Sequence, residues 1–589
     1  MALNSLNSAT PVGKTKSGSL AHYLPFLNWL VNYRREDLVG DMMAGLIVTI
    51  MLVPQGMAYA LLAGLPPEVG LYASIVPLII YGLLGTSRTL AVGPVAIVSL
   101  LVATGVAPLA ETGSGEYIRL AITLAFLVGI IQLVMGLVRL GFLVNFLSHP
   151  VLAGFTSAAA IVIGFSQVKH LLGLSMPSTE HFYEQVFYAA ANFTASNPVT
   201  VAIGLASIVV LFYFKQGLGR QLKRLGVAEP LVVPITKSGP LIVVLGGTLV
   251  VWLFGLNETA GVSIVGDVPA GLPPLSLPYF DLSLWEVLLP TALAISFVGY
   301  MESISVAKSL ASKRREKVEA NQELIALGAA NFGATFTGGY PVTGGFSRSV
   351  VNFAAGANTG LASIITAVLI GLTVVFLTPI FYFLPKAVLA AIIIVAVVGL
   401  IDVAAFKHVW RYNKADAASM IITFGAVLLV GIETGILVGA AAAILLYVWR
   451  TSRPHMAVVG RLGNSETYRN VLRHQVKTCP HVLTIRVDES LYFANTKYLE
   501  DTVLQMVADR PEVKHLVLIG AAINFIDSSA LETLESLITE LRDAGVEFHM
   551  ADIKGPVMDR LQAIGFADDV GGDHIHLSVH DAMRVLNCT

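Results

Sequence analysis

One short stretch combines glycine, proline, hydroxyl and arginine side chains within a strongly apolar region. It runs from Gly338 to Ser349 in the order GGYPVTGGFSRS, and Asn352 follows closely. Its glycines and Pro341 interrupt helical hydrogen bonding, and unpaired backbone at membrane depth is tolerated only where it lines a cavity or is buried in protein. A helix that restarts near Thr343 would point its free N–H groups and the positive end of its dipole into that cavity, which suits an anion.

Three side chains near this break can supply charge or hydrogen bonds. The hydroxyls of Thr343 and Ser347 and the nearby amides, including that of Gly344, can donate to oxyanion oxygens. A small residue such as Ser347 also serves ordinary helix packing. Arg348 either supplies positive field to the anion or forms an ion pair with Glu302, and the sequence leaves both roles open.

Glu302 lies within the apolar run ISFVGYMESIS at positions 295–305. A carboxylate inside a membrane span is costly and usually functional, so we first expect it to couple transport to an ion by carrying a proton. The alternative is a carboxylate near the cytoplasmic end of its span that pairs with Lys308 and positions the helix.

A second break, Gly93-Pro94, interrupts the apolar stretch at 90–97. Gln55 and Tyr59 are spaced i, i+4 on an earlier span, and they therefore share one helix face. An amide and an aromatic ring on one face can form the wall of a polar cavity, although interhelical hydrogen bonding and packing use the same residue types. We predict that the two breaks face each other across one substrate.

The composition places these residues in a membrane. Of 589 residues, 55% are hydrophobic and 13% are charged, and the mean hydropathy is +0.74, which predicts a polytopic α-helical membrane protein. We expect fourteen transmembrane segments, several of them shorter than a full crossing. Their approximate bounds are 39–61, 70–86, 92–109, 119–138, 142–168, 197–214, 239–255, 285–306, 320–337, 343–356, 360–382, 387–401, 415–430 and 434–450.

Positive charge falls on one side of this arrangement. If the N-terminus is cytoplasmic, the cytoplasmic connections hold most of the lysine and arginine, including Lys215, Lys237 and the run at 313–317, whereas the connection at 257–285 holds none. This asymmetry predicts an even number of spans with both termini in the cytoplasm. The two breaks recur seven spans apart, and an odd offset predicts that the two halves are inverted in the membrane.

The sequence divides into three parts. We expect a cytoplasmic N-terminal segment at 1–38, a transmembrane transport domain at 39–453 and a small cytoplasmic α/β domain at 454–589, because charge rises and apolar runs shorten after Arg453. The last part contains predicted strands at 481–486, 513–519 and 546–552 and predicted helices at 528–544 and 556–564.

Patterns of catalysis are missing from the sequence. It contains no Walker A motif, zinc-ligand spacing or nucleophile elbow, so we expect neither an enzyme nor a cofactor or metal. The two cysteines, Cys479 and Cys588, offer no disulfide framework. No basic domain is present that would favour nucleic-acid binding.

Five stretches of the sequence are similar to one family when they are taken together. They are VPQGMAYA at 53–60, GLYA at 70–73, GPV at 93–95, PVTGGFSRS at 341–349 and NFIDSSA at 524–530. The first four resemble the SulP (sulfate permease) family of anion transporters, and the fifth resembles its C-terminal STAS domain. The resemblance implies a 7+7 inverted repeat with core and gate domains, an elevator-like movement and a homodimer. By the same resemblance, the substrate site would be formed by Gln55, Tyr59, Pro94, Val95, Phe346, Ser347 and Arg348.

The resemblance also bears on coupling and regulation. Glu302 falls where proton-coupled sulfate carriers of the family have a glutamate. Sodium-coupled bicarbonate members have an aspartate there and a hydroxyl one turn later, where this chain has Val306. The triplet DSS at 527–529 is similar to a bacterial phosphorylation pattern. In that pattern a glycine follows the triplet, whereas this chain has Ala530. The sequence therefore allows two roles, regulatory phosphorylation of Ser528 or Ser529 and a helix N-cap at Ser528.

We therefore predict a secondary active transporter of an inorganic anion in the cell membrane, with sulfate uptake coupled to protons as the leading hypothesis. The alternatives are a sodium-dependent bicarbonate symporter, an exchanger or channel for chloride, oxalate or dicarboxylate, and a membrane-anchored signalling protein. Helix-end amides bind many oxyanions, so the sequence does not choose among them.

Overall fold

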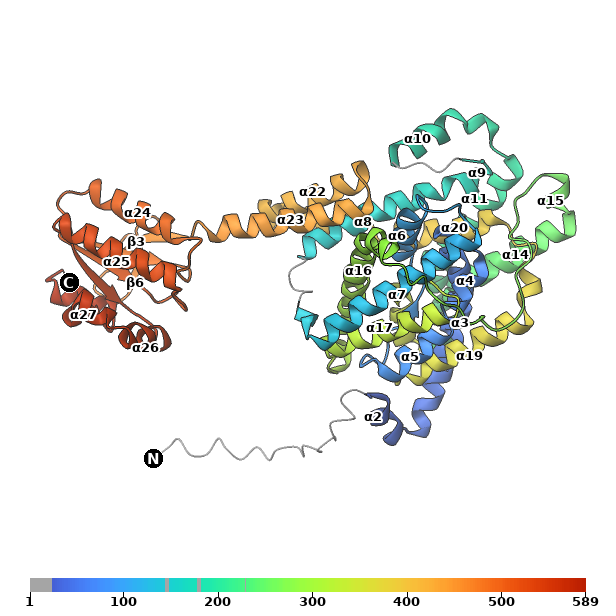
Figure 1. Ribbon diagram of the computed structural model, residues 1–589, viewed down its shortest axis with the longest axis horizontal. Helices are drawn as coiled ribbons and strands as arrows, with labels where there is room; N and C mark the ends of the chain where they lie inside the picture. The colour runs from blue at the N-terminus through green and yellow to red at the C-terminus, as the bar shows by residue number, and fades with distance from the viewer. Residues whose placement is uncertain (1–23, 143–147, 177–181, 228, 589) are drawn as a thin grey trace. The chain divides into compact units, whose positions relative to one another are not determined.

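The computed structural model describes residues 24–142, 148–176, 182–227 and 229–588 of the chain (Figure 1). The chain forms two compact units, Met1–Ala443 and Ile444–Thr589. The first unit is helical apart from two short strands in its described part, and the second is an α/β unit. Of the predicted N-terminal segment at 1–38, residues 1–23 lie outside the described residues.

Fourteen apolar segments follow one another in the described part of the chain, and each corresponds to one predicted span. In chain order they are α3 (Arg35–Leu62), α4 with α5 (Pro67–Tyr72, Val76–Leu84), β1 with α6 (Val92–Gly93, Ala96–Val106), α7 (Gly115–Leu137), α8 with α9 (His149–Ser166, Val168–Leu172), α11 (Pro198–Phe212), α14 (Gly239–Phe254), α16 (Leu282–Arg314), α17 (Ala320–Phe336), β2 with α18 (Thr343–Gly344, Phe346–Ala354), α19 (Leu361–Phe376), α20 (Lys386–Val398), α22 (Lys414–Leu429) and α23 (Ile432–Thr451). Eight helical runs among the described residues are long and apolar enough to cross a membrane unbroken.

Shorter elements connect these segments. They are α2 (Phe26–Val31), α10 (Phe182–Ala191), η2 (Phe193–Ala195), η3 (Tyr213–Gly217), α12 (Leu218–Arg224), α13 (Glu229–Lys237), α15 (Leu256–Thr259), η4 (Thr378–Phe381) and α21 (Val403–Tyr412). Local chemistry sets several of the helix ends. The side chain of Ser114 caps α7 by accepting the N–H of Tyr117, and Asn197 caps α11 just before Pro198. Gly255 ends α14 in the left-handed conformation.

The helices of the first unit pack in two groups. In one group α7 and α5 pack on α17, and α3 packs on α19; in the other α8 packs on α22, and α11 packs on α20 (Figure 1). Without water between helices, close packing depends on small residues at the contacts. At Gly328 on α17, an added Cβ would lie 2.8 Å from the backbone nitrogen of Leu133 on α7. The two groups match the predicted division into a core and a gate.

The second unit is built on one sheet of six strands in the order β4-β3-β5-β6-β7-β8, with β5 to β8 parallel and β3 antiparallel to both of its neighbours. The strands are β3 (Met456–Arg461), β4 (Tyr468–Asn470), β5 (Val482–Val487), β6 (His515–Ile519), β7 (Glu547–Ala551) and β8 (Ile575–His576). The helical elements are α24 (Thr496–Ala508), α25 (Ser528–Asp543), α26 (Gly555–Ala563), α27 (Phe566–Val570), η5 (Gly572–His574) and α28 (Val579–Val585). The predicted strands at β5, β6 and β7 and the predicted helices at α25 and α26 are confirmed. The sequence analysis missed β3, β4, β8, α24 and α28.

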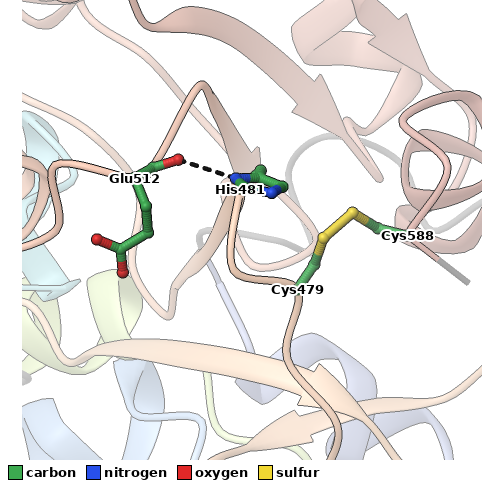
Figure 2. Close-up of a disulfide and its surroundings, with 4 residues drawn as sticks. All are labelled: Cys479, His481, Glu512 and Cys588. Carbon is green, nitrogen blue, oxygen red and sulfur yellow. Dashed lines mark hydrogen bonds between the residues drawn. A yellow bond between two sulfur atoms is a disulfide. The ribbon is translucent and has the colours of Figure 1, made fainter.

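Two local expectations for this unit are wrong. The N-cap of α25 is Asp527, which accepts the N–H of Ala530 at 2.8 Å, and Ser528 is instead the first helical residue. Cys479 and Cys588 form a disulfide, as Figure 2 shows. Their Cα atoms are 5.7 Å apart. They are 109 residues apart in the sequence, so only the folded topology of the sheet and α28 brings them together.

Candidate functional site

The two sequence breaks lie side by side, whereas a substrate between them stays a prediction. β1 and β2 form an antiparallel pair in which Val92 is opposite Gly344 and Gly93 is opposite Thr343. Each strand leads directly into a half-helix, α6 after β1 and α18 after β2. The backbone groups freed by the glycines and prolines therefore pair with each other inside the protein, which is what burial at membrane depth requires.

Side chains of α18 hold this pair of strands together. The N–H of Ala91 donates to Ser349 Oγ at 2.9 Å, and the amide of Asn352 donates to the carbonyl oxygen of Thr89 at 3.0 Å. The N–H of Gly345 donates to the carbonyl oxygen of Ala91 at 3.1 Å. Ser349 and Asn352 are thus positioning residues, since they fix the third segment against the tenth.

The half-helix of the tenth segment begins at Phe346, three residues after the expected start. Thr343 donates its hydroxyl to the carbonyl oxygen of Gly299 at 2.6 Å, and the N–H of Gly344 donates to Ser303 Oγ at 2.8 Å. Thr343 and Gly344 form β2, and their partners lie on α16, so these contacts attach the strand to that helix. The structure therefore directs the hydrogen-bonding groups of Thr343 and Gly344 toward α16.

A cavity of about 330 Å³ lies against the two half-helices. Most of the predicted site residues line it: Gln55, Tyr59, Val95, Glu302, Phe346, Ser347 and Arg348. Pro94, Thr343 and Gly344 are not part of the lining, although Pro94 adjoins the lining residue Val95 and Gly344 adjoins the lining residue Gly345. Ala96 and Ile97 also line the cavity, so the first turns of both half-helices border the same space. Helix N-termini that converge in this way favour an anion.

Arg348 is 2% exposed and crosses from one broken segment to the other. Its Nη1 donates to the carbonyl oxygen of Pro94, while Nε and Nη2 have no hydrogen-bond partner among the described residues. Gly345 makes room for the guanidinium, because a Cβ there would lie 2.8 Å from Nη2. A buried guanidinium with unused donors is the kind of group that binds a planar or tetrahedral oxyanion.

Glu302 comes from α16 and lines the same cavity as Arg348. Its Oε2 atom is buried and, within the described part of the chain, has no hydrogen-bond partner. Gln55 and Tyr59 of α3 also line the cavity and are 6% and 7% exposed. The cavity thus contains a carboxylate, a guanidinium, an amide and a phenol, in addition to the helix N-termini.

The sequence analysis missed the contribution of the other helix group. Lys215, Thr236 and Lys237 line this cavity and also a neighbouring one of about 370 Å³, to which Arg220 and Lys223 contribute. In the sequence these cations indicate only a cytoplasmic connection. Their clustering on the single connection between α11 and α14 is the signal for a basic approach that concentrates anions.

Comparison with known proteins decides the family. The sequence profile of the sulfate permease family matches residues 38–423, and that of the STAS domain matches residues 473–582. The chain belongs to the sulfate permease family. This family is one of transporters, so the expectation that the chain is not an enzyme is confirmed.

Individual members of the sulfate permease family resemble the chain over nearly its whole length. Sulfate transporter 4.1, chloroplastic, of Arabidopsis thaliana is 38% identical over 574 residues, which are 95% of this chain and 82% of the relative. High affinity sulfate transporter 2 of Stylosanthes hamata is 32% identical over 591 residues, which are 97% of this chain and 88% of the relative.

Solved structures agree with this assignment. The murine Solute Carrier 26 family member A9 anion transporter, in its inward-facing state, superposes with a TM-score of 0.88 at 26% identity and covers 99% of this chain and 97% of that one. The transmembrane domain of the cyanobacterial bicarbonate transporter BicA shares the fold, with a TM-score of 0.58 at 22% identity over 70% of this chain and 98% of that one. The chain is a polytopic α-helical membrane transporter of inorganic anions with a C-terminal STAS domain.

Proposed function

We propose that this transporter takes up sulfate together with protons by an elevator-like alternating-access movement. The observation that supports it most directly is one cavity lined by both Glu302 and Arg348, whose Oε2 and whose Nε and Nη2, respectively, have no hydrogen-bond partner among the described residues. The plant relatives named as sulfate transporters favour sulfate among the oxyanions that such a cavity suits.

In the proposal, sulfate binds between the two half-helices. The amides in the first turns of α6 and α18 and the guanidinium of Arg348 neutralise part of its charge, and the Gln55 amide on α3 supplies a further donor. Desolvation of a doubly charged anion is costly, so several donors must replace its water at once. The side chain of Ser347 lines the cavity and supplies one more hydroxyl donor.

The net charge of the sulfate-loaded site supports coupling to a proton. Sulfate carries two negative charges, and Arg348 with an ionised Glu302 adds none, so the loaded site would move with a charge of about −2. Protonation of Glu302 reduces that charge to about −1 and lowers the electrostatic cost of moving the loaded core across the apolar layer. We therefore expect the protonated, sulfate-loaded core to move most readily.

The two walls of the cavity support an elevator-like movement. The predicted site residues all belong to the helix group of α3, α6, α16 and α18. The opposite group, through α20, presents mainly apolar side chains to the cavity, namely Ile392, Val395, Ala396 and Val397. The α20 face therefore offers the substrate no side-chain hydrogen bonds that would have to break when the substrate-bearing group slides past it. The polar side chains that the opposite group adds to the lining, Lys215, Thr236 and Lys237, come from the connection between α11 and α14.

The transport test uses proteoliposomes with the full-length chain. Acidifying the outside should stimulate accumulation of labelled sulfate against its gradient, and Glu302→Gln should lose that stimulation because it no longer exchanges a proton. Glu286→Gln is the matched control, since Glu286 is exposed on the same helix and does not line the cavity. Uptake that ignores an imposed pH gradient would rule out proton coupling.

Further measurements in the same assay distinguish this proposal from the alternative transport functions. Stimulation by a sodium gradient, with bicarbonate competing better than sulfate, would support the sodium-bicarbonate hypothesis. Equilibration without net accumulation would support a channel or exchanger. The buried Val306, one turn after Glu302, offers no oxygen ligand for sodium, which weighs against the first of these.

We also propose a cell-membrane location with both termini in the cytoplasm, a homodimer, and the domain boundary after Arg453. Ser528 and Ser529 are exposed, and Ser528 lines a small cavity with Arg560. A phosphate on Ser528 would lie at the N-terminus of α25 with a guanidinium across this cavity, which favours regulation by phosphorylation. Mass spectrometry of the protein from its native cells, with Ser528→Ala as the comparison, tests this idea.

A further inference from the structure

A cluster of histidines lies on the sheet of the STAS domain, outside the transport site. Strand register explains why these side chains meet. His515 is opposite Glu547 in the β6–β7 pair, His549 follows Glu547 by two residues, and His576 is opposite Ala551 in the β7–β8 pair. Side chains two residues apart on a strand point to the same face, so all four polar side chains share one face of the sheet.

Three ligand atoms of this cluster are close together. His515 Nδ1 lies 3.1 Å from Glu547 Oε2 and 3.3 Å from His549 Nε2, and the distance from His549 Nε2 to Glu547 Oε2 is 3.9 Å. A tetrahedral Zn²⁺ with bonds of about 2.0–2.1 Å separates its ligand atoms by about 3.3–3.4 Å. The three atoms therefore lie near three corners of such a tetrahedron, and small side-chain movements would complete it.

Neighbouring groups prepare His549 to act as a ligand. Its Nδ1 lies 3.3 Å from His576 Nε2, an arrangement that orients the ring and leaves Nε2 for a metal. The ring of His574 packs against that of His549 at an interplanar angle of 38°, with centroids 4.3 Å apart. Burial in the first place, and then the three histidine neighbours, lowers the pKa of His549 to about 3, so the ring is neutral at neutral pH.

The site has a buried side and an open side. The His549 side chain is 4% exposed, whereas those of His515 and Glu547 are 26% and 59% exposed. A metal could therefore enter from solvent and keep its fourth position for water. Two imidazoles and one carboxylate suit Zn²⁺ better than Mg²⁺ or Ca²⁺, which prefer all-oxygen ligand sets.

We propose that the STAS domain binds one transition-metal ion of the Zn²⁺ class through His515 Nδ1, Glu547 and His549 Nε2. The sequence analysis expected no metal, because these ligands come from two strands and match no linear spacing. The ion would join the first residue of β6 to the beginning of β7 and thereby stabilise the amino-terminal end of this parallel strand pair. This inference is independent of the anion and the coupling ion proposed for transport.

Metal binding is measured on the full-length chain in detergent, carrying an affinity tag without histidine and stripped with EDTA. Titration with Co²⁺ alone should give one bound equivalent with the intense visible absorption typical of four-coordinate cobalt. One equivalent of Zn²⁺ should displace it and remove the absorption. Zn²⁺ should also raise the unfolding temperature, since it binds the folded domain.

Variants locate the ion. Glu547→Gln and His515→Gln, both at partly open positions, should abolish the visible absorption, and His576→Gln should weaken binding about tenfold by releasing the His549 ring. The control is His455→Gln, because His455 lies in the same unit and pairs with Asp488 at 2.7 Å away from the cluster. It should bind Co²⁺ like the unchanged protein.

Two results would overturn the proposal. One is the absence of stoichiometric Co²⁺ and Zn²⁺ binding by the unchanged protein. The other is binding by Glu547→Gln and His515→Gln at unchanged affinity. Unfolding temperatures of the metal-free proteins show whether each variant is folded, and a folded Glu547→Gln that gains no stability from Zn²⁺ supports the site.

Discussion

Two glutamates of the transmembrane unit occupy contrasting environments. Glu323 on α17 is 0% exposed and accepts four hydrogen bonds, from the Tyr81 hydroxyl, the N–H and hydroxyl of Thr86 and the N–H of Ser87. Glu302 on α16 lines the cavity, and its Oε2 has no partner in the described part of the chain. A buried carboxylate whose donors are all supplied by the protein holds structure, whereas one that lacks them is available to a proton or substrate.

Asp41 on α3 is, like Glu323, a buried carboxylate whose hydrogen-bond donors are supplied by the protein. It accepts hydrogen bonds from the N–H groups of Asn358 and Thr359 and from the hydroxyls of Thr359 and Tyr33. Glu323 braces the loop before the third segment, and Asp41 braces the loop after the tenth. The two satisfied carboxylates thus fix the far ends of the broken segments, and Glu302 lies where those segments converge.

The largest expected effect is that of Glu323→Ala. It leaves four buried or partly buried donors without an acceptor, so the folded state should lose at least about 3 kcal/mol. The yield of monodisperse protein and the unfolding temperature in detergent measure this loss. Glu319→Ala, at an exposed position just before α17, is the control and should behave like the unchanged protein. A stable, fully active Glu323→Ala would remove the distinction between the two glutamates.

Asp41→Asn should have the next largest effect. The amide retains one acceptor oxygen but turns its NH₂ toward donors, and hydrogen bonds to a charged acceptor are stronger than those to a neutral one. We expect a loss of about 2 kcal/mol, measured as a lower unfolding temperature with unchanged sulfate affinity. Glu36→Gln, exposed on the same helix, should change neither quantity. A loss of affinity without a loss of stability would assign Asp41 to the transport site instead.

These contacts show which parts of the structure the sequence could predict. Glycine and proline within apolar runs indicated both breaks, because those residues disrupt helical hydrogen bonding wherever they occur. Hydropathy and the distribution of positive charge indicated the number of segments. The role of Glu323 was missed, since its donors lie more than two hundred residues away and no local pattern brings them to it.

The site was predictable where it depends on the breaks themselves. Gln55, Tyr59 and Arg348 line one cavity with the half-helices, in agreement with their expected grouping. Lys215 and Lys237 come from the other helix group, and only tertiary packing brings them to the cavity. From the sequence, the expected partner of Arg348 was either Glu302 or the anion. The structure shows a third partner, the carbonyl oxygen of Pro94.

Arg348→Gln tests the cationic side of the cavity. It removes the two unpartnered donors and the charge, so sulfate affinity should fall at least about tenfold, or roughly 1.4 kcal/mol. Binding to the detergent-purified chain measures the change, and Arg348→Lys should recover part of it by restoring the charge without the planar fork. Arg314→Lys is the control, because Arg314 contacts Phe353 and Ala357 at the other end of α18. Equal sulfate affinity in Arg348→Gln would confine this arginine to a positioning role.

The smallest expected change in stability is that of Glu302→Gln, and it sharpens the comparison most. The glutamine keeps one oxygen to accept the backbone N–H of Phe346, and the Oε2 that it replaces has no partner in the described part of the chain. No donor therefore loses its acceptor, and the free energy of unfolding should stay within about 0.5 kcal/mol of that of the unchanged protein. Unfolding temperatures measured alongside Glu323→Gln supply the contrast, because the same chemical change there weakens four hydrogen bonds. If Glu302→Gln proves as destabilising as Glu323→Gln, then Glu302 is a structural residue as well, and a proton carrier must be sought elsewhere among the residues that line the cavity.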